Sequence, residues 1–469
     1  MTIPNPYDSP TARRAFLAHL DRLAALTETE QDLVRLGQMP GLGRWLEQIH
    51  NIGGCAHPIY ITGHTTTRDT ITGDVLRHYT TRDEPGGRLA IRCGNRRAGL
   101  CPSCSRLYQG DTFHLVRAGL IGGKGIPDDV RTHPRVFATL TAPSFGPVHR
   151  AGTCHSNRRG RCAHGRTRRC RTVHADDDPR IGQPLCADCY DYVGHVLWNA
   201  HAPRLWNAFC INLYHHLAAA AGVKRSRIRK HVRICAAKVA EYQARGAIHF
   251  HAVIRIDGPD GPGSTPPAWA TTGLLIETIR TAAGAVRLFA PPSSAYGERQ
   301  LPYGDQFEAH ALRADAGGTL TDEQVAAYVA KYTTKSAHES GALDHRIGHP
   351  DRISHLPLTA HHRALIGTCW RLGNVPELAH LNLHAWAHTL GYRGHCLTKS
   401  RTYSTTYTEL RAERARHQGA LYTHDTEDTV TASAWSYAGS GHTPGEALIA
   451  LGIAENVARS RELARGARA

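Results

Sequence analysis

The segment with the most chemical information runs from Val239 to Asp257 and reads VAEYQARGAIHFHAVIRID. Side chains alternate between the two faces of a β-strand, so His249 and His251 share one face and the apolar residues around them take the other. If the preceding turn has an odd loop, for example residues 244–246, Glu241 lies opposite His249 on that face. Two imidazoles and a carboxylate form an open ligand set for a divalent cation. We therefore predict a metal site at His249, His251 and Glu241.

A second segment, VAAYVAKYTTK over residues 325–335, follows a capping-box pattern and predicts a helix. Tyr328 and Tyr332 are four residues apart and share one helix face, and Lys331 and Lys335 form a second such pair. A phenol that attacks a phosphodiester forms a covalent phosphotyrosine and leaves a free 3′-hydroxyl, while lysines offset the phosphate charge. For an isolated helix, the simpler interpretation would be that these two tyrosines only pack in the core. The metal hairpin before them favours catalysis.

Several motifs occur together in a fixed order: TLTAPS over residues 139–144, His249-Phe-His251, and YVAKYTTK over residues 328–335. This order resembles motifs I to III of the HUH-type rolling-circle replication initiators. CGNRRAGLCPSC (93–104) and PLCADCY (184–190) resemble the initiators of actinobacterial plasmids and integrative conjugative elements. The resemblance covers residues 50–410 or so.

That resemblance implies an HUH endonuclease core, a central antiparallel sheet with flanking helices, which holds Mg²⁺ or Mn²⁺. It also implies that Tyr332 nicks one strand at a double-strand origin, and that a host helicase and polymerase are partners. An HUH transposase or relaxase would use the same chemistry, but relaxases usually place the tyrosine before the histidine pair. A protein of another class, a non-catalytic zinc-dependent DNA-binding regulator, would use the cysteines and leave the histidines structural.

The chain has 13 cysteines, several of them in CxxC pairs. Cys101 and Cys104 can hold two corners of a tetrahedral Zn²⁺, with Cys93 as a third ligand and Cys55 or His57 as a fourth. A second group offers more candidates than one site needs: Cys154, Cys162, His164, Cys170, Cys186 and Cys189. Of these, a Cys₄ site would use Cys162, Cys170, Cys186 and Cys189, although Cys101 and Cys104 could also pair with Cys186 and Cys189. We predict structural zinc, with two ions in the chain.

Basic residues cluster in two places. An insert at residues 150–191 is rich in arginine. Its arginines from Arg150 to Arg171 have no acidic residue between them, which predicts contact with phosphates or the minor groove. A second run over residues 224–230 leads into the metal hairpin and could seat the DNA strand that enters the site. The DNA-binding residues predicted from both are Arg158, Arg159, Arg161, Arg166, Arg168, Arg169, Lys224, Arg225, Arg227, Arg229 and Lys230.

The whole chain agrees with a nucleic-acid partner. Its net charge is +16 over 469 residues, and such a surplus attracts polyanions. The 41% apolar content is enough for folded cores. The N-terminus lacks the order of a signal peptide and no apolar run is long enough for a membrane span, so we expect a cytoplasmic protein with reduced thiols.

The expected helices and strands that position these residues indicate an α+β fold with zinc-binding insertions and helical N- and C-terminal regions. Strands are expected near residues 59–62, 88–93 and 135–141, a long helix from Val193 to Gly222, and two Arg-rich helices near the C-terminus. We divide the chain into a helical region (1–50), a first zinc-binding module (51–131), an endonuclease domain (132–345, with the insert at 150–191) and a C-terminal helical region (346–469).

Overall fold

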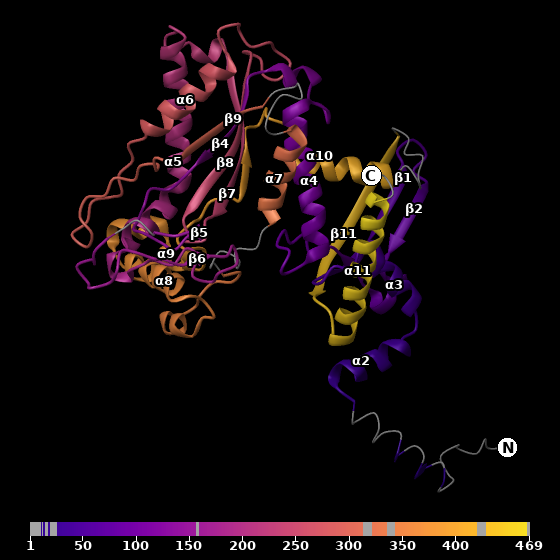
Figure 1. Cartoon of the computed structure of the whole chain (residues 1–469). Coiled ribbons are helices and arrows are strands. Elements are labelled where there is room, and N and C mark those ends of the chain that lie inside the picture. The colour runs from indigo at the N-terminus through magenta and orange to yellow at the C-terminus, as the bar shows by residue number, and fades with distance from the viewer. Residues whose placement is uncertain are drawn as a thin grey trace, which may run out of the picture. The chain divides into compact units, whose positions relative to one another are not determined.

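The computed structural model describes residues 26–155, 159–312, 321–334, 343–419 and 428–466, with a few isolated residues between 11 and 18. It has two compact units (Figure 1). Unit 1 comprises Met1–Tyr108 and Arg414–Ala469, and unit 2 comprises Gln109–Glu413. Among the described residues, no helix combines the length and apolar character needed to cross a membrane.

Unit 1 is built on a four-stranded antiparallel sheet in which β1 pairs with β11, β2 and β3. Its elements are α2 (Glu28–Gly37), α3 (Leu42–Asn51), β1 (Ile59–Asp69), β2 (Val75–Thr80), β3 (Leu89–Ile91), β11 (Thr429–Ser440) and α11 (Pro444–Gly466). Two helices, α4 (Pro102–Ile121) and α10 (Tyr407–Gly419), begin in one unit and end in the other.

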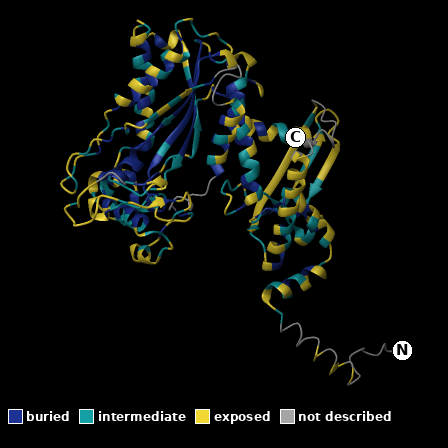
Figure 2. Cartoon of the chain, in the orientation of Figure 1, coloured by how far each residue is buried: buried dark blue, intermediate teal, exposed yellow. Residues whose placement is uncertain are grey.

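The strand β11 is where the structure departs from the sequence prediction for the C-terminal region. That region was expected to be helical, and α10, α11 and the helix α8 (Ala360–Gly373) agree with this. The strand between α10 and α11 was missed because its pairing partner, β1, lies more than 300 residues away in sequence. Most of β11 is exposed, so its sequence lacks the clear apolar alternation of a half-buried strand (Figure 2).

Unit 2 contains a five-stranded antiparallel sheet in the order β10-β7-β8-β4-β9. The strands are β4 (Arg135–Leu140), β7 (Arg233–Tyr242), β8 (Ile248–Asp257), β9 (Phe307–Ala311) and β10 (Leu397–Lys399), and the insert adds β5 (Gly152–Thr153) and β6 (Val173–His174). The helices are α5 (Tyr192–Ala220), α6 (Thr272–Gly284), α7 (Asp322–Thr334), α8 and α9 (Leu383–Trp386). This is the α+β class, with helices flanking an antiparallel sheet, that the sequence predicted.

The two faces of this sheet have separate cores. Phe250 and Ile254 of β8 pack with α5 and α6, whereas Val253 of β8 and Val239 of β7 pack with α7 and the C-terminal half of α4 (Figure 1). This division follows from the alternation of side chains along a strand. His249 and His251 alternate with the first set, so they face the same side as α7.

A buried ion pair ties α7 to the sheet. Arg135 of β4 has no exposed surface and bonds Asp322, the first residue of α7, at 2.8 Å. The same guanidinium donates to the carbonyl of Leu120 near the end of α4. Removing one partner of such a pair leaves an uncompensated buried charge and costs about 3–5 kcal/mol. The pair therefore helps to fix the register of α7 over the strands.

Candidate active site and metal centres

The hairpin β7–β8 places the three predicted metal ligands together. Glu241 is directly opposite His249 in the register, and Val239 is opposite His251. Gln243 donates its backbone N–H to Ala247, which leaves the three-residue loop 244–246 that the sequence suggested. Its last residue, Gly246, has φ +84, and a side chain there would press against Leu390. Glycine at this position sets the turn and hence the face on which Glu241 lies.

The donor atoms of this set, the metal triad, converge. Glu241 Oε2 is 3.1 Å from His249 Nε2 and 3.1 Å from His251 Nε2, and the two nitrogens are 3.2 Å apart. Adjacent ligands of an octahedral ion with bond lengths of about 2.1 Å are about 3.0 Å apart. The triad therefore matches the size of a divalent cation. Thr139 of β4 pairs with His251 and bonds its Nδ1 at 3.0 Å, which orients the ring so that Nε2 faces the triad.

Electrostatics favour the metal-binding protonation states of Glu241 and His249. Burial alone would raise the pKa of Glu241, but the hydrogen bonds of His249 and His251 lower that pKa to about 2. Burial lowers the pKa of His249, although Glu241 opposes this shift. An ionised carboxylate and a neutral imidazole are the forms that bind cations.

Helix α7 places both tyrosines at the triad. The Tyr328 hydroxyl is 3.3 Å from His251 Nε2, and the rings of Tyr328 and Tyr332 have centroids 4.5 Å apart. The Tyr332 ring centroid is 5.9 Å from that of His251. Burial, followed by a hydrogen bond with Tyr332, raises the pKa of Tyr328. Two phenols and three metal ligands thus occupy one site on the α7 side of the sheet.

Of the two lysines predicted near the tyrosines, only Lys331 lies among the described residues. Lys331 is exposed, and its Nζ lies 5.9 Å from the centroid of the Tyr332 ring. Lys335 lies outside the described residues. Lys331 is thus close enough to Tyr332 to meet a phosphate that approaches this tyrosine from solvent.

Comparison with known proteins decides the family. Residues 41–455 match the family RepSA, described as "Replication initiator protein, pSAM2". A replication initiator protein of Streptomyces ambofaciens is 48% identical over 448 residues, which cover 93% of this chain and 95% of that protein. The chain belongs to the RepSA family of replication initiators. This confirms the family predicted from the motifs. No solved structure matches the chain.

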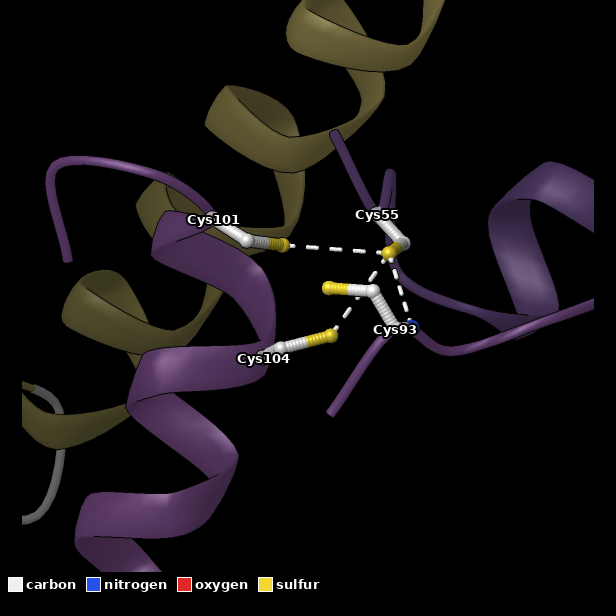
Figure 3. Close-up of side chains that lie close together, drawn as sticks. All are labelled: Cys55, Cys93, Cys101 and Cys104. Atoms are coloured by element: carbon white, nitrogen blue, oxygen red, sulfur yellow. Dashed lines mark hydrogen bonds between the residues drawn. The ribbon is translucent and has the colours of Figure 1, made fainter. Parts of the chain in front are cut away.

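In this replication initiator the first cysteine group forms a compact cluster in unit 1 (Figure 3). Cys101 Sγ and Cys104 Sγ lie 3.8 Å and 3.6 Å from Cys55 Sγ, and Cys93 completes the set. Two thiolates on a tetrahedral Zn²⁺, each about 2.3 Å from the ion, are about 3.8 Å apart. Cys55 therefore takes the fourth position, and His57 is exposed outside the cluster.

The second cysteine group does not form the predicted Cys₄ set. Cys162, Cys186 and Cys189 lie together, but the fourth member of their cluster is His164. Cys170 belongs to a different cluster with Cys154 and two histidines, His149 and His174. The prediction included His164 among the candidate ligands but preferred a set of four thiols, which put Cys170 in the place of His164. The pairing of Cys101 and Cys104 with Cys186 and Cys189 does not occur either, because each pair has its own cluster.

The predicted DNA-binding residues fall into two surfaces of unit 2. Those of the insert that the structure describes are all exposed: Arg159, Arg161, Arg166, Arg168 and Arg169. Arg158 lies outside the described residues. The insert adjoins the hairpin of β7 and β8, because a side chain on Gly182 would collide with the backbone of Ala244.

The second basic run lies elsewhere than the sequence suggested. Its cationic residues are all exposed: Lys224, Arg225, Arg227, Arg229 and Lys230. The run precedes the start of β7, whereas Glu241 is near the end of this strand, eight residues beyond Arg233. Eight residues of strand span roughly 26 Å. The run is adjacent to the metal hairpin in sequence but lies at the opposite end of the strand.

Sequence reasoning missed several residues that support these sites. The ring of Phe137 stacks on His251 with centroids 5.9 Å apart, and Thr139 bonds the same histidine. Both lie on β4, at or next to the first motif, but no pattern indicated which strand would flank the histidines. His149 and His174 were missed because each stands alone in a chain with 32 histidines.

Proposed function

We propose that this replication initiator nicks one DNA strand at its origin with a tyrosine of α7 and so starts rolling-circle replication. The observation that carries the proposal is that the Tyr328 hydroxyl lies 3.3 Å from the same His251 nitrogen that faces Glu241. A tyrosine nucleophile and a cation site within one small volume fit phosphodiester cleavage. Bound Mg²⁺ or Mn²⁺ would polarise the scissile phosphate and offset its developing charge.

In the proposed reaction the phenol oxygen of Tyr332 bonds to phosphorus and the bond from phosphorus to the 3′ oxygen breaks. The phenolic proton goes to solvent or to a neighbouring base, and the leaving oxygen gains a proton to become a 3′-hydroxyl. The resemblance of residues 328–335 to the third motif assigns the first cleavage to Tyr332. Burial raises the pKa of Tyr328, which opposes formation of the Tyr328 phenolate. The free 3′ end would then prime the host polymerase, behind a host helicase.

DNA binding is assigned mainly to the exposed arginines of the insert. These arginines belong to the insert, and another residue of the insert, Gly182, packs against Ala244 of the hairpin loop. Phosphate contacts of this kind supply affinity without reading sequence, whereas the triad acts on one phosphate only. Loss of the triad is therefore expected to abolish cutting and spare most of the binding.

The test uses a supercoiled plasmid that carries the origin recognised by this initiator, with Mg²⁺ or Mn²⁺ present. Tyr332→Phe should slow nicking by at least about 10⁴-fold, in line with loss of a nucleophile. Tyr328→Phe should still nick but release fewer closed circles, because a second cleavage ends each round. Tyr437→Phe is the matched control, since this exposed tyrosine lies in unit 1.

Mapping of the covalent phosphotyrosine peptide identifies the nucleophile directly. A dead Tyr328→Phe beside an active Tyr332→Phe would reverse the assignment. A double variant that nicks normally would remove tyrosine chemistry on α7.

A further inference from the structure

Eight residues between 149 and 189 form two clusters of potential metal ligands, and the two clusters alternate along the chain. They form four consecutive pairs: His149 and Cys154, Cys162 and His164, Cys170 and His174, and Cys186 and Cys189. The first pair lies with the third, and the second lies with the fourth. Successive pairs along the chain therefore belong alternately to one cluster and to the other.

The cluster of the first and third pairs has the dimensions of a tetrahedral zinc site. His149 Nδ1 is 3.2 Å from His174 Nε2, Cys154 Sγ is 3.8 Å from His149 Nδ1, and Cys170 Sγ is 3.4 Å from His174 Nε2. Bond lengths of about 2.0 Å to nitrogen and 2.3 Å to sulfur give edges of about 3.3 Å between nitrogens and 3.5 Å between nitrogen and sulfur. The second cluster has comparable spacing, with His164 Nδ1 at 3.2 Å from Cys189 Sγ and 3.9 Å from Cys186 Sγ.

A carboxylate orients one ligand of the first cluster. His174 is almost fully buried and its Nδ1 bonds Asp178 at 2.8 Å, which leaves Nε2 for the cluster. Asp178 is held in turn by Arg180 at 2.8 Å. Metal-bound histidines usually have such a carboxylate behind them, because it fixes the ring and its tautomer. This bond is an observation independent of the cluster's own distances.

The insert has almost no apolar core of its own. Within the described part of residues 150–189, the apolar side chains that are buried are Cys154 and Cys186, both members of the clusters. A segment of this size cannot be held by so little hydrophobic burial. Structural zinc supplies folding energy in such cases.

We propose that residues 149–189 form a cross-braced module that binds two Zn²⁺ ions, one by His149, Cys154, Cys170 and His174 and one by Cys162, His164, Cys186 and Cys189. With the Cys₄ cluster of unit 1, the chain binds three zinc ions. The arginines of residues 159–169 lie in the two segments that link one cluster to the other along the chain. The Gly182 N–H bonds the carbonyl of the ligand His149 while Gly182 packs on Ala244, so the first ion braces the catalytic hairpin.

The first test needs no variant. Elemental analysis of the reduced, full-length protein should give three zinc ions per chain. X-ray absorption at the zinc edge should give nine sulfur and three nitrogen ligands over the three ions. Two ions with sulfur ligands alone would overturn the proposal, because that is the result for two Cys₄ sites.

Two double variants test the interleaving. Cys154→Ser with Cys170→Ser removes two ligands of one ion and should lower the zinc content from three to two. Cys154→Ser with Cys162→Ser removes one ligand of each ion and should lower it to one. Cys210→Ser is the control, because this thiol is in no cluster. Equal loss of a single ion in both double variants overturns the pairing. If both lose two ions because the insert unfolds, the sulfur-to-nitrogen ratio of the unaltered protein decides.

Discussion

The metal triad and the cross-braced insert bring similar donors together on opposite kinds of scaffold. The triad stands on β7 and β8, which pair residue by residue over their whole length and lie in a five-stranded sheet. The ligand clusters of the insert lie mainly in loops, next to β5 and β6, which are strands of only two residues each. Figure 2 shows the same contrast in burial: the sheet is buried and the insert is largely exposed.

This difference teaches which part of the molecule depends on its ion. Backbone pairing and the packing of residues such as Val253 hold the strands whether or not a cation is bound. The loops of the insert have no comparable support. The Cys₄ cluster of unit 1 is intermediate, because Cys55, Cys101 and Cys104 are buried in a core with Trp45 and Ile49.

Among the changes that test this comparison, the largest expected effect comes from the loss of a ligand of the metal triad. His251→Ala should lower the nicking rate by at least about a thousandfold, because the triad loses a ligand that also contacts Tyr328. The melting temperature should change by a few degrees at most, since the sheet does not rely on the ion. His310→Ala on β9 is the control, because His310 is an exposed histidine of the same sheet. Loss of structure in His251→Ala would contradict the comparison.

The loop-based site should show the reverse behaviour. Removal of zinc by a chelator should raise tryptic cleavage after the arginines of residues 159–171 by at least about tenfold, because local unfolding exposes them. Cleavage within β7 and β8 should stay unchanged over the same interval. Mass spectrometry of the fragments measures both rates, and readdition of Zn²⁺ should restore protection. An insert that resists trypsin without zinc would remove the contrast.

The metal triad was largely predictable from sequence, because it lies on regular secondary structure with a fixed side-chain period. Alternation along β8 put His249 and His251 on one face, and a glycine-containing odd loop put Glu241 opposite. Helical periodicity likewise put Tyr328 and Tyr332 on one face of α7. These patterns are local, so a short stretch of sequence determines each one.

The loop-based sites were only partly predictable, because loop ligands have no period. The CxxC pairs were recognised, but the grouping of Cys170 with His149 and Cys154 instead of Cys186 and Cys189 depends on contacts between separate loops. The same applies to β11, whose partner is distant in sequence. Contacts between distant segments are set by the whole fold, and a single sequence does not specify them locally.

A smaller effect is expected where the insert meets DNA. Arg168→Ala with Arg169→Ala should weaken binding to duplex DNA, and the slope of log affinity against log salt should fall by about 0.9 for each phosphate that the protein no longer neutralises. Zinc content should stay the same, since neither residue is a ligand. Arg280→Ala on α6 is the control, because this exposed arginine pairs with Glu277. Fluorescence anisotropy over a salt series measures the slopes, and equal slopes for both proteins would assign the DNA surface elsewhere.

The smallest effect, and the sharpest test of the comparison, concerns two residues with the same task. Thr139 bonds Nδ1 of His251 at 3.0 Å, and Asp178 bonds Nδ1 of His174 at 2.8 Å, so each orients the ring of a metal ligand. Thr139→Val and Asp178→Asn should each weaken binding of the local ion by about 10-fold. This is the lower end of the loss in metal affinity that follows when a residue that orients a ligand is replaced. Thr139→Val should shift the nicking rate to higher Mg²⁺ or Mn²⁺ concentrations and leave tryptic resistance unchanged. Asp178→Asn should instead raise cleavage of the insert at limiting zinc, because there the ion holds the fold. If both variants change nicking and protection alike, the two scaffolds depend on their ions to the same degree.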